Sequence, residues 1–139
     1  MESLQYVKAE DRVQLQATTG NGQALQLDRL LGIWLNTDDE SQGIIKILVE
    51  ARGPALIVRA FGACDSGPCD WGEVQAGQVY SNSISSNLAA GFTAGYHSDF
   101  SETHLQANWN QGLLVMASFT TFKDGSNRAN YFSREFFHQ

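Results

Sequence analysis

The stretch that decides the fold is LLGIWLNTDDESQGIIKILV, residues 30–49, in which two apolar segments flank a polar turn. In the second segment Ile45, Ile47 and Val49 fall on one face of an extended chain, and Lys46 falls on the other. A repeat of two residues is the signature of a half-buried β-strand. The stretch therefore predicts the first hairpin of an antiparallel sheet.

The same alternation, interrupted by turn residues, continues to the C-terminus. We expect eight strands, at about residues 31–37, 43–51, 55–63, 69–78, 88–97, 102–109, 113–123 and 127–137. Short links rich in Gly, Asn and Asp favour consecutive hairpins, and closing such strands into a barrel removes their exposed edges. The expected fold is all-β, an eight-stranded antiparallel up-and-down β-barrel, and a β-sandwich is the alternative.

The N-terminal part of the chain is harder to assign. Residues 1–21 alternate weakly and are expected to form an extension or an edge hairpin, whereas residues 22–139 are expected to form a single β-barrel domain. The segment GQALQLDRLLG, residues 22–32, has a ragged apolar face after Asn21, a residue type that caps helices. We expect a short helix there.

Composition excludes several classes of function. Apolar residues make up 42% of the chain and charged residues 17%, which favours a folded domain. With 15 acidic and 9 basic residues the net charge is −6, and no concentrated basic region suggests a nucleic-acid or membrane partner. The longest apolar run, residues 113–119, is much shorter than the roughly 20 residues of a membrane-spanning helix. The first residues lack the pattern of a signal peptide, so the sequence does not fix a localisation.

Gly32, Trp34 and Asn36 open the first expected strand with the pattern Gly-x-Trp-x-Asn. This opening resembles that of the avidin and lipocalin branches of the calycin superfamily. The resemblance implies a barrel whose closed end is filled by Trp34, with an arginine of the last strand, Arg128 or Arg134, packed on the ring. A plug of this size needs a hydrogen-bond partner for its indole N–H, which a carbonyl can provide. The alternative is that Trp34 is an ordinary core residue of a barrel that binds no ligand.

The avidin branch also implies ligand contacts from the asparagine and from a serine in the first turn. Asn36 matches, and Ser41 stands one residue later than the usual spacing. The avidin pattern has a tyrosine on the third strand, where this chain has Arg59 and Phe61. The resemblance therefore does not imply biotin binding.

A second resemblance rests on the sequence Cys-x4-Cys-Asp-Trp-Gly, which runs from Cys64 through Cys69 and Trp71. Together with the opening motif it resembles a family of small bacterial domains, over most of residues 28–136. Because paired hairpin positions lie within disulfide range, a Cys64–Cys69 disulfide is the first expectation and would fit an exported protein. Free thiols are the alternative, and the spacing does not suit a zinc site.

One further cluster, HSDFSETH, places His97 and His104 around Asp99 and Glu102. Such side chains can bind a divalent ion across a hairpin, but alternation puts both imidazoles on the solvent face. We expect a polar turn and no metal site or cofactor. The sequence has no nucleophile elbow or phosphate-binding loop, so no catalytic residue is predicted.

The leading hypothesis is a non-catalytic β-barrel that binds a small apolar or mixed ligand, because an eight-stranded barrel can hold one small molecule. The predicted ligand contacts are Trp34, Asn36, Arg59, Trp71, Tyr80, Tyr96 and Trp109. The Ser/Asn-rich residues 81–87 are expected to serve as a lid. Two alternatives remain: a barrel filled by its own side chains that forms a homodimer through the apolar strand 113–123, and a calycin-type enzyme such as a cyclase or a chromophore-handling protein.

Overall fold

The computed structural model describes residues 25–139, so the expectations for residues 1–21 and for Asn21 lie outside the described part. The described chain is all-β, as expected, apart from one 3-10 helical turn. Its elements are η1 (Asp28–Leu30), β1 (Gly32–Asn36), β2 (Ile44–Arg52), β3 (Ala55–Cys64), β4 (Gly67–Gln75), β5 (Gln78–Ser81), β6 (Ala89–His97), β7 (Ser101–Asn110), β8 (Leu113–Phe122) and β9 (Tyr131–His138).

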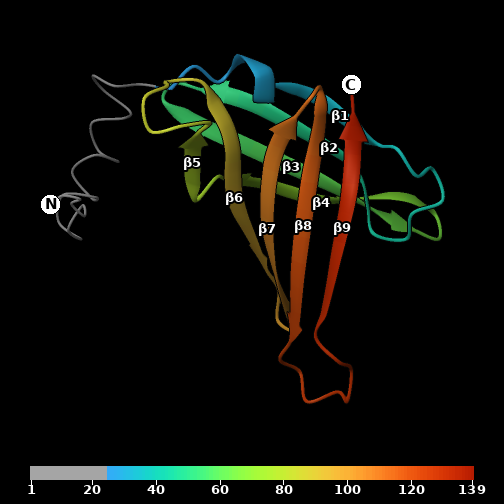
Figure 1. Ribbon diagram of the computed structural model, residues 1–139. Helices are drawn as coiled ribbons and strands as arrows, with labels where there is room; N and C mark the ends of the chain where they lie inside the picture. The colour runs from blue at the N-terminus through green and yellow to red at the C-terminus, as the bar shows by residue number, and fades with distance from the viewer. Residues whose placement is uncertain (1–24) are drawn as a thin grey trace, which may run out of the picture.

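All nine strands belong to one antiparallel sheet with the order β4-β3-β2-β1-β9-β8-β7-β6-β5. Sequential strands are neighbours except at one place, and β1 pairs with β9, which joins the beginning and the end of the described chain. The sheet curls into a half-barrel, as Figure 1 shows. A single sheet with this order is the expected meander and rules out the sandwich.

The strand count was wrong by one, because the expected strand 69–78 is divided. At residues 76 and 77 the backbone leaves one edge of the sheet and joins the other: Ala76 N–H donates to Leu56 O on β3, and Gly77 N–H donates to Thr93 O on β6. The chain then continues as the short strand β5. β4 and β5 are therefore the two edges of the sheet, and between them Ala76 is bonded to β3 and Gly77 to β6, each at 2.8 Å.

One end of the curled sheet is packed with apolar side chains. The largest fully buried side chains are Trp34, Phe92, Phe137, Leu30, Ile47, Leu105, Leu114, Met116 and Val58. η1 lies across this end and contributes Leu30, while Leu25, Leu27 and Leu31 pack against the core. Burial of so much apolar surface is the main stabilising term of a domain of this size. We refer to this region as the closed end.

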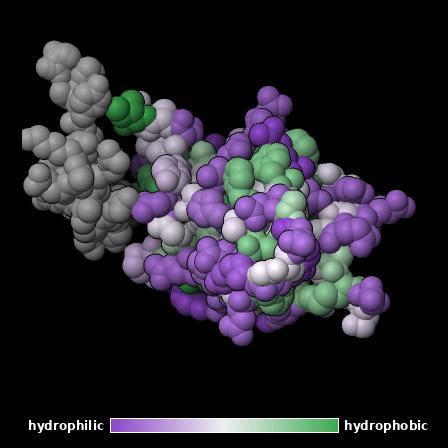
Figure 2. All heavy atoms as spheres, turned by 90° about the horizontal axis from the view of Figure 1, so that it is seen from below, coloured by the Kyte–Doolittle hydropathy of each residue, from purple (hydrophilic) through white to green (hydrophobic). Residues whose placement is uncertain are grey.

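The opposite end has a different character. In Figure 1 the loop between β8 and β9 lies at the end of the long strands farthest from η1. Viewed from that side, hydrophobic atoms reach the surface at several places between hydrophilic side chains, as Figure 2 shows. We refer to this region as the open end.

Candidate functional site

The inward-facing side chains change from apolar to polar along the strands. On β8, Leu114 and Met116 are followed on the same face by Ser118 and Thr120. On β9, running the other way, Phe137 is preceded on the inner face by Glu135 and Ser133. The change from apolar to polar side chains occurs at the same height on neighbouring strands, because Ser118 pairs with Ser133, and Thr120 pairs with Thr103 and Tyr131. The interior of the half-barrel is therefore apolar at the closed end and polar toward the open end.

A cleft of about 470 Å³ occupies that polar part. Its walls come from the β1–β2 turn, the start of β2, β3, β4, β7, β8 and β9, and we call it the polar lobe. It is lined by Asp38, Glu40, Ser41, Gln42, Gly43, Ile44, Gly62, Ala63, Trp71, Thr103, Ser118, Thr120, Tyr131, Ser133 and Glu135. Binding pockets for small molecules commonly measure about 300–1,000 Å³.

A second cleft of about 500 Å³ adjoins the first and shares Trp71, Thr103, Thr120 and Tyr131 with it. It is otherwise richer in aromatic side chains, so we call it the aromatic lobe. Its remaining lining residues are Tyr96, His97, Ser98, Phe100, Ser101, Phe122 and Arg128. Phe100 and Tyr131 are about half exposed, at 50% and 54%, so this lobe opens to solvent at the rim.

Glu135 is the carboxylate that projects into the interior, and two side chains fix its position. Asn36 Nδ2 donates to Glu135 Oε2 at 3.0 Å, and Ser41 Oγ also donates to Oε2. A Cβ placed on Gly43 would lie 3.1 Å from Glu135 Oε1, so the glycine makes room for the carboxylate. Glu135 lines the polar lobe, and no hydrogen bond to its Oε1 is found within residues 25–139.

Asn36 acts through Glu135 and the turn and does not line the cleft. Its Nδ2 also donates to Ile44 O at 2.8 Å, and its Oδ1 accepts the N–H of Asp38 at 2.8 Å. All the hydrogen-bonding atoms of the amide thus have partners within the protein. Asn36 is a positioning residue for Glu135, which differs from the predicted direct ligand contact.

Trp34 fills the closed end, as the sequence motif predicted. Its side chain is 1% exposed, and its Nε1 donates to Leu30 O at 3.0 Å. The predicted arginine of the last strand is absent from this ring: Arg134 lies over Phe132, and Arg128 over Phe122. The arginine that stacks at the closed end is Arg29 of η1, and its partner is Trp109, 4.2 Å away. Trp109 therefore also belongs to the closed end and not to the clefts.

Trp71 and Tyr96 do lie at the open end, where their rings pack edge to face with centroids 5.3 Å apart. A bulge on β4 places Trp71 and Gly72 opposite Ala60, which interrupts the ladder with β3. The Tyr96 hydroxyl fills the gap: it accepts the N–H of Ala60 at 3.0 Å and donates to Gly72 O at 2.9 Å. Burial raises the pKa of Tyr96 above its ordinary value. Trp71 is a wall of both lobes, and Tyr96 supports it.

Arg59 and Tyr80 lie outside the half-barrel, contrary to the prediction. Arg59 projects from the outer face of β3 and forms an ion pair with Asp70. This guanidinium is the main cause that lowers the pKa of Asp70 to about 2. Tyr80 pairs with Gly91 on the outer side of β6.

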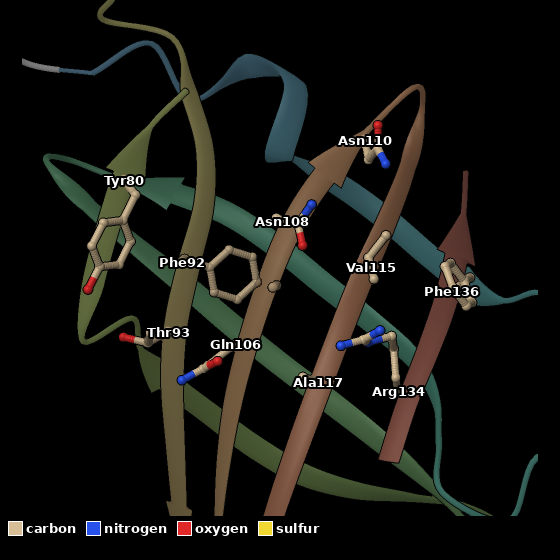
Figure 3. A pocket seen from close by; sticks show the side chains of 11 residues that line it. Tyr80, Phe92, Thr93, Gln106, Asn108, Asn110, Val115, Ala117, Arg134 and Phe136 are labelled. Atoms are coloured by element: carbon tan, nitrogen blue, oxygen red, sulfur yellow. The ribbon is translucent and has the colours of Figure 1, made fainter. Parts of the chain in front are cut away.

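Tyr80 borders a groove on the outer face of β5 to β9, shown in Figure 3. Tyr80 stands on one side of this groove and Arg134 and Phe136 on the other, with the amides of Gln106 and Asn108 between them. The groove measures about 620 Å³ and is separated from the interior clefts by the sheet itself.

The predicted lid is at the wrong end of the molecule. Residues 81–87 connect β5 to β6 beside η1, and Asn87 O accepts the N–H of Gln26 there. None of these residues lines either lobe. The loops that border the open end are residues 38–43, 98–101 and 123–130. The last of these loops is longer than expected, because β9 begins at Tyr131 and not near residue 127.

Cys64 and Cys69 are joined in a disulfide across the β3–β4 hairpin, with their Cα atoms 5.8 Å apart. The turn is tighter than expected, because Cys64 pairs with Gly67 and Cys69 with Gly62, so the two cysteines are diagonal neighbours. Within HSDFSETH residues 98–100 form the turn between β6 and β7, His97 and Glu102 lie 3.7 Å apart at the rim, and His104 faces outward on β7. Within residues 25–139 no three His, Cys, Asp or Glu side chains come together to hold a metal ion.

Sequence reasoning missed Glu135, Ser118, Thr120 and Thr103. The signal for Ser118 and Thr120 was present, since the inner face of residues 114–120 reads Leu, Met, Ser, Thr. Comparisons with models of protein families, with curated proteins and with solved structures find no match for this chain. No helix within the described residues is long and apolar enough to span a membrane.

Proposed function

We propose that the protein is a non-catalytic, calycin-like β-barrel that binds a small ligand in the two lobes at the open end. The observation that carries this proposal is the contrast within the interior. The closed end is packed with apolar side chains, whereas the open end is polar and contains the two clefts. A barrel that served only as a scaffold gains stability from filling its interior with apolar side chains. Here the strands continue beyond the core, but their inner faces carry serine, threonine and glutamate.

The lining supports a ligand of mixed character. Trp71 and Tyr131 offer flat apolar surface to an aromatic or aliphatic part, and the fixed carboxylate and hydroxyl groups of the polar lobe offer hydrogen bonds. A few fixed polar groups in a largely aromatic pocket are typical of sites that orient a small molecule. The disulfide holds the β3–β4 hairpin next to Trp71.

The experiment compares the wild-type chain with Ser118→Met, which fills the polar lobe from β8. Isotope-labelled protein is titrated with benzyl alcohol, indole and benzylamine, and amide chemical shifts are followed by NMR. We expect shifts at residues 36–43, 71, 118–120 and 131–135 in the wild type and their loss in the variant. Shifts confined to other regions, or equal shifts in both proteins, would contradict the proposal.

A second function is favoured by one specific observation: the outer face of β1, β8 and β9 carries exposed large apolar side chains. These are Ile33, Leu35, Phe119, Phe132 and Phe136, with exposed fractions from 41% to 57%. Large apolar side chains exposed on one face of a protein often mark an interaction surface. We propose that a second copy of the chain covers it, because a two-fold pairing buries the same patch on both subunits.

The oligomeric state tests this second proposal. The wild-type chain and the double variant Phe132→Ser, Phe136→Ser are compared by light scattering after size-exclusion chromatography. We expect a dimer mass for the wild type and a monomer mass for the variant. A monomeric wild type would overturn the homodimer without affecting the ligand-binding proposal.

A further inference from the structure

The polar lobe has an unusual charge distribution. Asp38, Glu40 and Glu135 line it, and no lysine, arginine or histidine does. Arg128, the arginine that lines the aromatic lobe, is paired with Asp124 at 2.7 Å and lies over Phe122. The lobe therefore presents negative charge that no side chain within residues 25–139 neutralises from inside it.

Carboxylates around a loop are often only a solvated turn, but a second observation points to a ligand. Ser118 is only 8% exposed and projects into the polar lobe, and no hydrogen-bond partner for its hydroxyl is found within the described residues. Thr120, the next inward residue, is satisfied by Thr103 at 3.1 Å. A buried hydroxyl without a partner costs free energy, so its place in the cleft is explained by a group that enters from outside.

The side walls of the polar lobe, like its carboxylates, suit a cation. Trp71 and Tyr131 flank the lobe, and the faces of such rings attract ammonium groups. Glu135 Oε2 is occupied by Asn36 and Ser41, while Oε1 remains available as an acceptor. Because the three carboxylates do not converge as metal ligands, the fitting cation is organic and not a metal ion.

We propose that the ligand of the open end is a small organic cation, with a protonated nitrogen bound by Glu135 and Ser118 in the polar lobe and an apolar or aromatic part in the aromatic lobe. This inference rests on the proposed ligand-binding function and specifies its ligand class. One N–H group of this nitrogen donates to Glu135 Oε1, and another donates to the hydroxyl oxygen of Ser118. The acidic turn residues Asp38 and Glu40 add attraction at the mouth, which salt weakens.

The test uses three probes that share a ring and differ in charge: benzylamine, which is protonated at pH 7, benzyl alcohol and benzoate. Each is titrated into the full chain, and affinity is measured by NMR shifts of residues 41–43 and 131–135. We expect benzylamine to bind most tightly and benzoate most weakly. In Glu135→Gln, which can still accept from Asn36 and Ser41, benzylamine affinity should fall about tenfold, the usual contribution of a charged hydrogen bond, and benzyl alcohol affinity should fall much less.

Two further variants keep the test decisive if Glu135→Gln folds poorly. Glu40→Gln removes a carboxylate from the mouth and should weaken benzylamine about twofold, as expected for an exposed charge. Asp28→Asn removes the same charge at the closed end and should leave benzylamine affinity unchanged. Benzyl alcohol or benzoate binding in the cleft as tightly as benzylamine would overturn the cation inference and leave the ligand-binding function standing. If none of the three probes shifts the cleft residues, the proposed function fails with it.

Discussion

The closed and open ends of the same half-barrel are built from the same strands and yet follow different rules. At the closed end Met116, Leu114 and Phe137 are fully buried against Trp34. Two residues further along β8, the inner face carries Ser118, whose hydroxyl has no partner within the described residues. Because the backbone ladders continue through both regions, the difference lies in the side chains alone. The comparison teaches that stability is concentrated at one end and the capacity to bind at the other.

The largest effect is expected for Trp34→Ala at the closed end. Truncating a buried tryptophan removes apolar burial and leaves a cavity, which costs about 3–5 kcal/mol of unfolding free energy. The loss is measured by denaturant unfolding followed by circular dichroism. A cost below about 1 kcal/mol would mean that the closed end is not the stabilising region, given the usual range for such cavities.

The next effect contrasts two neighbours on the inner face of β8. Met116→Ser should lower the unfolding free energy by about 2–5 kcal/mol, since it creates a cavity and buries a hydroxyl. Ser118→Ala should be neutral or stabilising by up to about 1 kcal/mol, because the hydroxyl it removes has no partner. Equal destabilisation by both substitutions in chemical unfolding would remove the distinction between the two ends.

A smaller effect is expected for Gly62→Ala on β3. A Cβ there would lie 2.7 Å from Nε1 of Trp71, so the indole must move away from the wall that both lobes share. Overpacking of this kind costs about 1–3 kcal/mol. We expect a shift of tryptophan fluorescence and weaker benzylamine binding. Gly95→Ala is the matched control, since its Cβ would make an ordinary contact of 3.6 Å with His97; an equal fluorescence change in the control would refute the prediction.

The smallest effect concerns the ion pair on the outer face. The pKa of Asp70 is lowered to about 2, first by the Arg59 side chain and then by the N–H of Gly72. A lowered folded-state pKa stabilises the protein above the ordinary carboxyl pKa, and that contribution is lost as the pH falls toward 2. Asp70→Asn should therefore slightly lower the thermal midpoint at pH 7, and the difference should shrink as the pH falls and vanish only below about pH 2. A variant with the same midpoint as the wild type at pH 7 would show that this exposed pair contributes nothing.

The parts of this molecule that follow from local pattern could be predicted from sequence. The strands of the hairpins, Trp34 as the plug with a carbonyl partner and the Cys64–Cys69 bridge all depend on neighbours close in the chain. Ser118 was equally predictable, but its polarity was not recognised within an otherwise apolar strand.

Other features depend on where strands meet, which the sequence does not state. The third strand has apolar residues on both faces, so alternation could not decide that Arg59 points outward. Tyr80 lies beyond residues 76 and 77, where the chain changes from one sheet edge to the other with a single glycine, Gly77, as its turn signal. On β9 aromatic side chains occupy both faces. Alternation therefore could not show that Glu135 points inward while Phe132 and Phe136 point outward.

The most direct test of the two-ended interior is methyl NMR in the presence of a small neutral nitroxide, which enhances the relaxation of solvent-accessible groups. The probe should reach the methyl groups of Thr103 and Thr120 at the open end and leave those of Leu114 and Met116 unaffected. Strong enhancement at the threonines with none at the closed end is the predicted result. Equal protection of all four side chains would show that the open end is packed and would contradict the account.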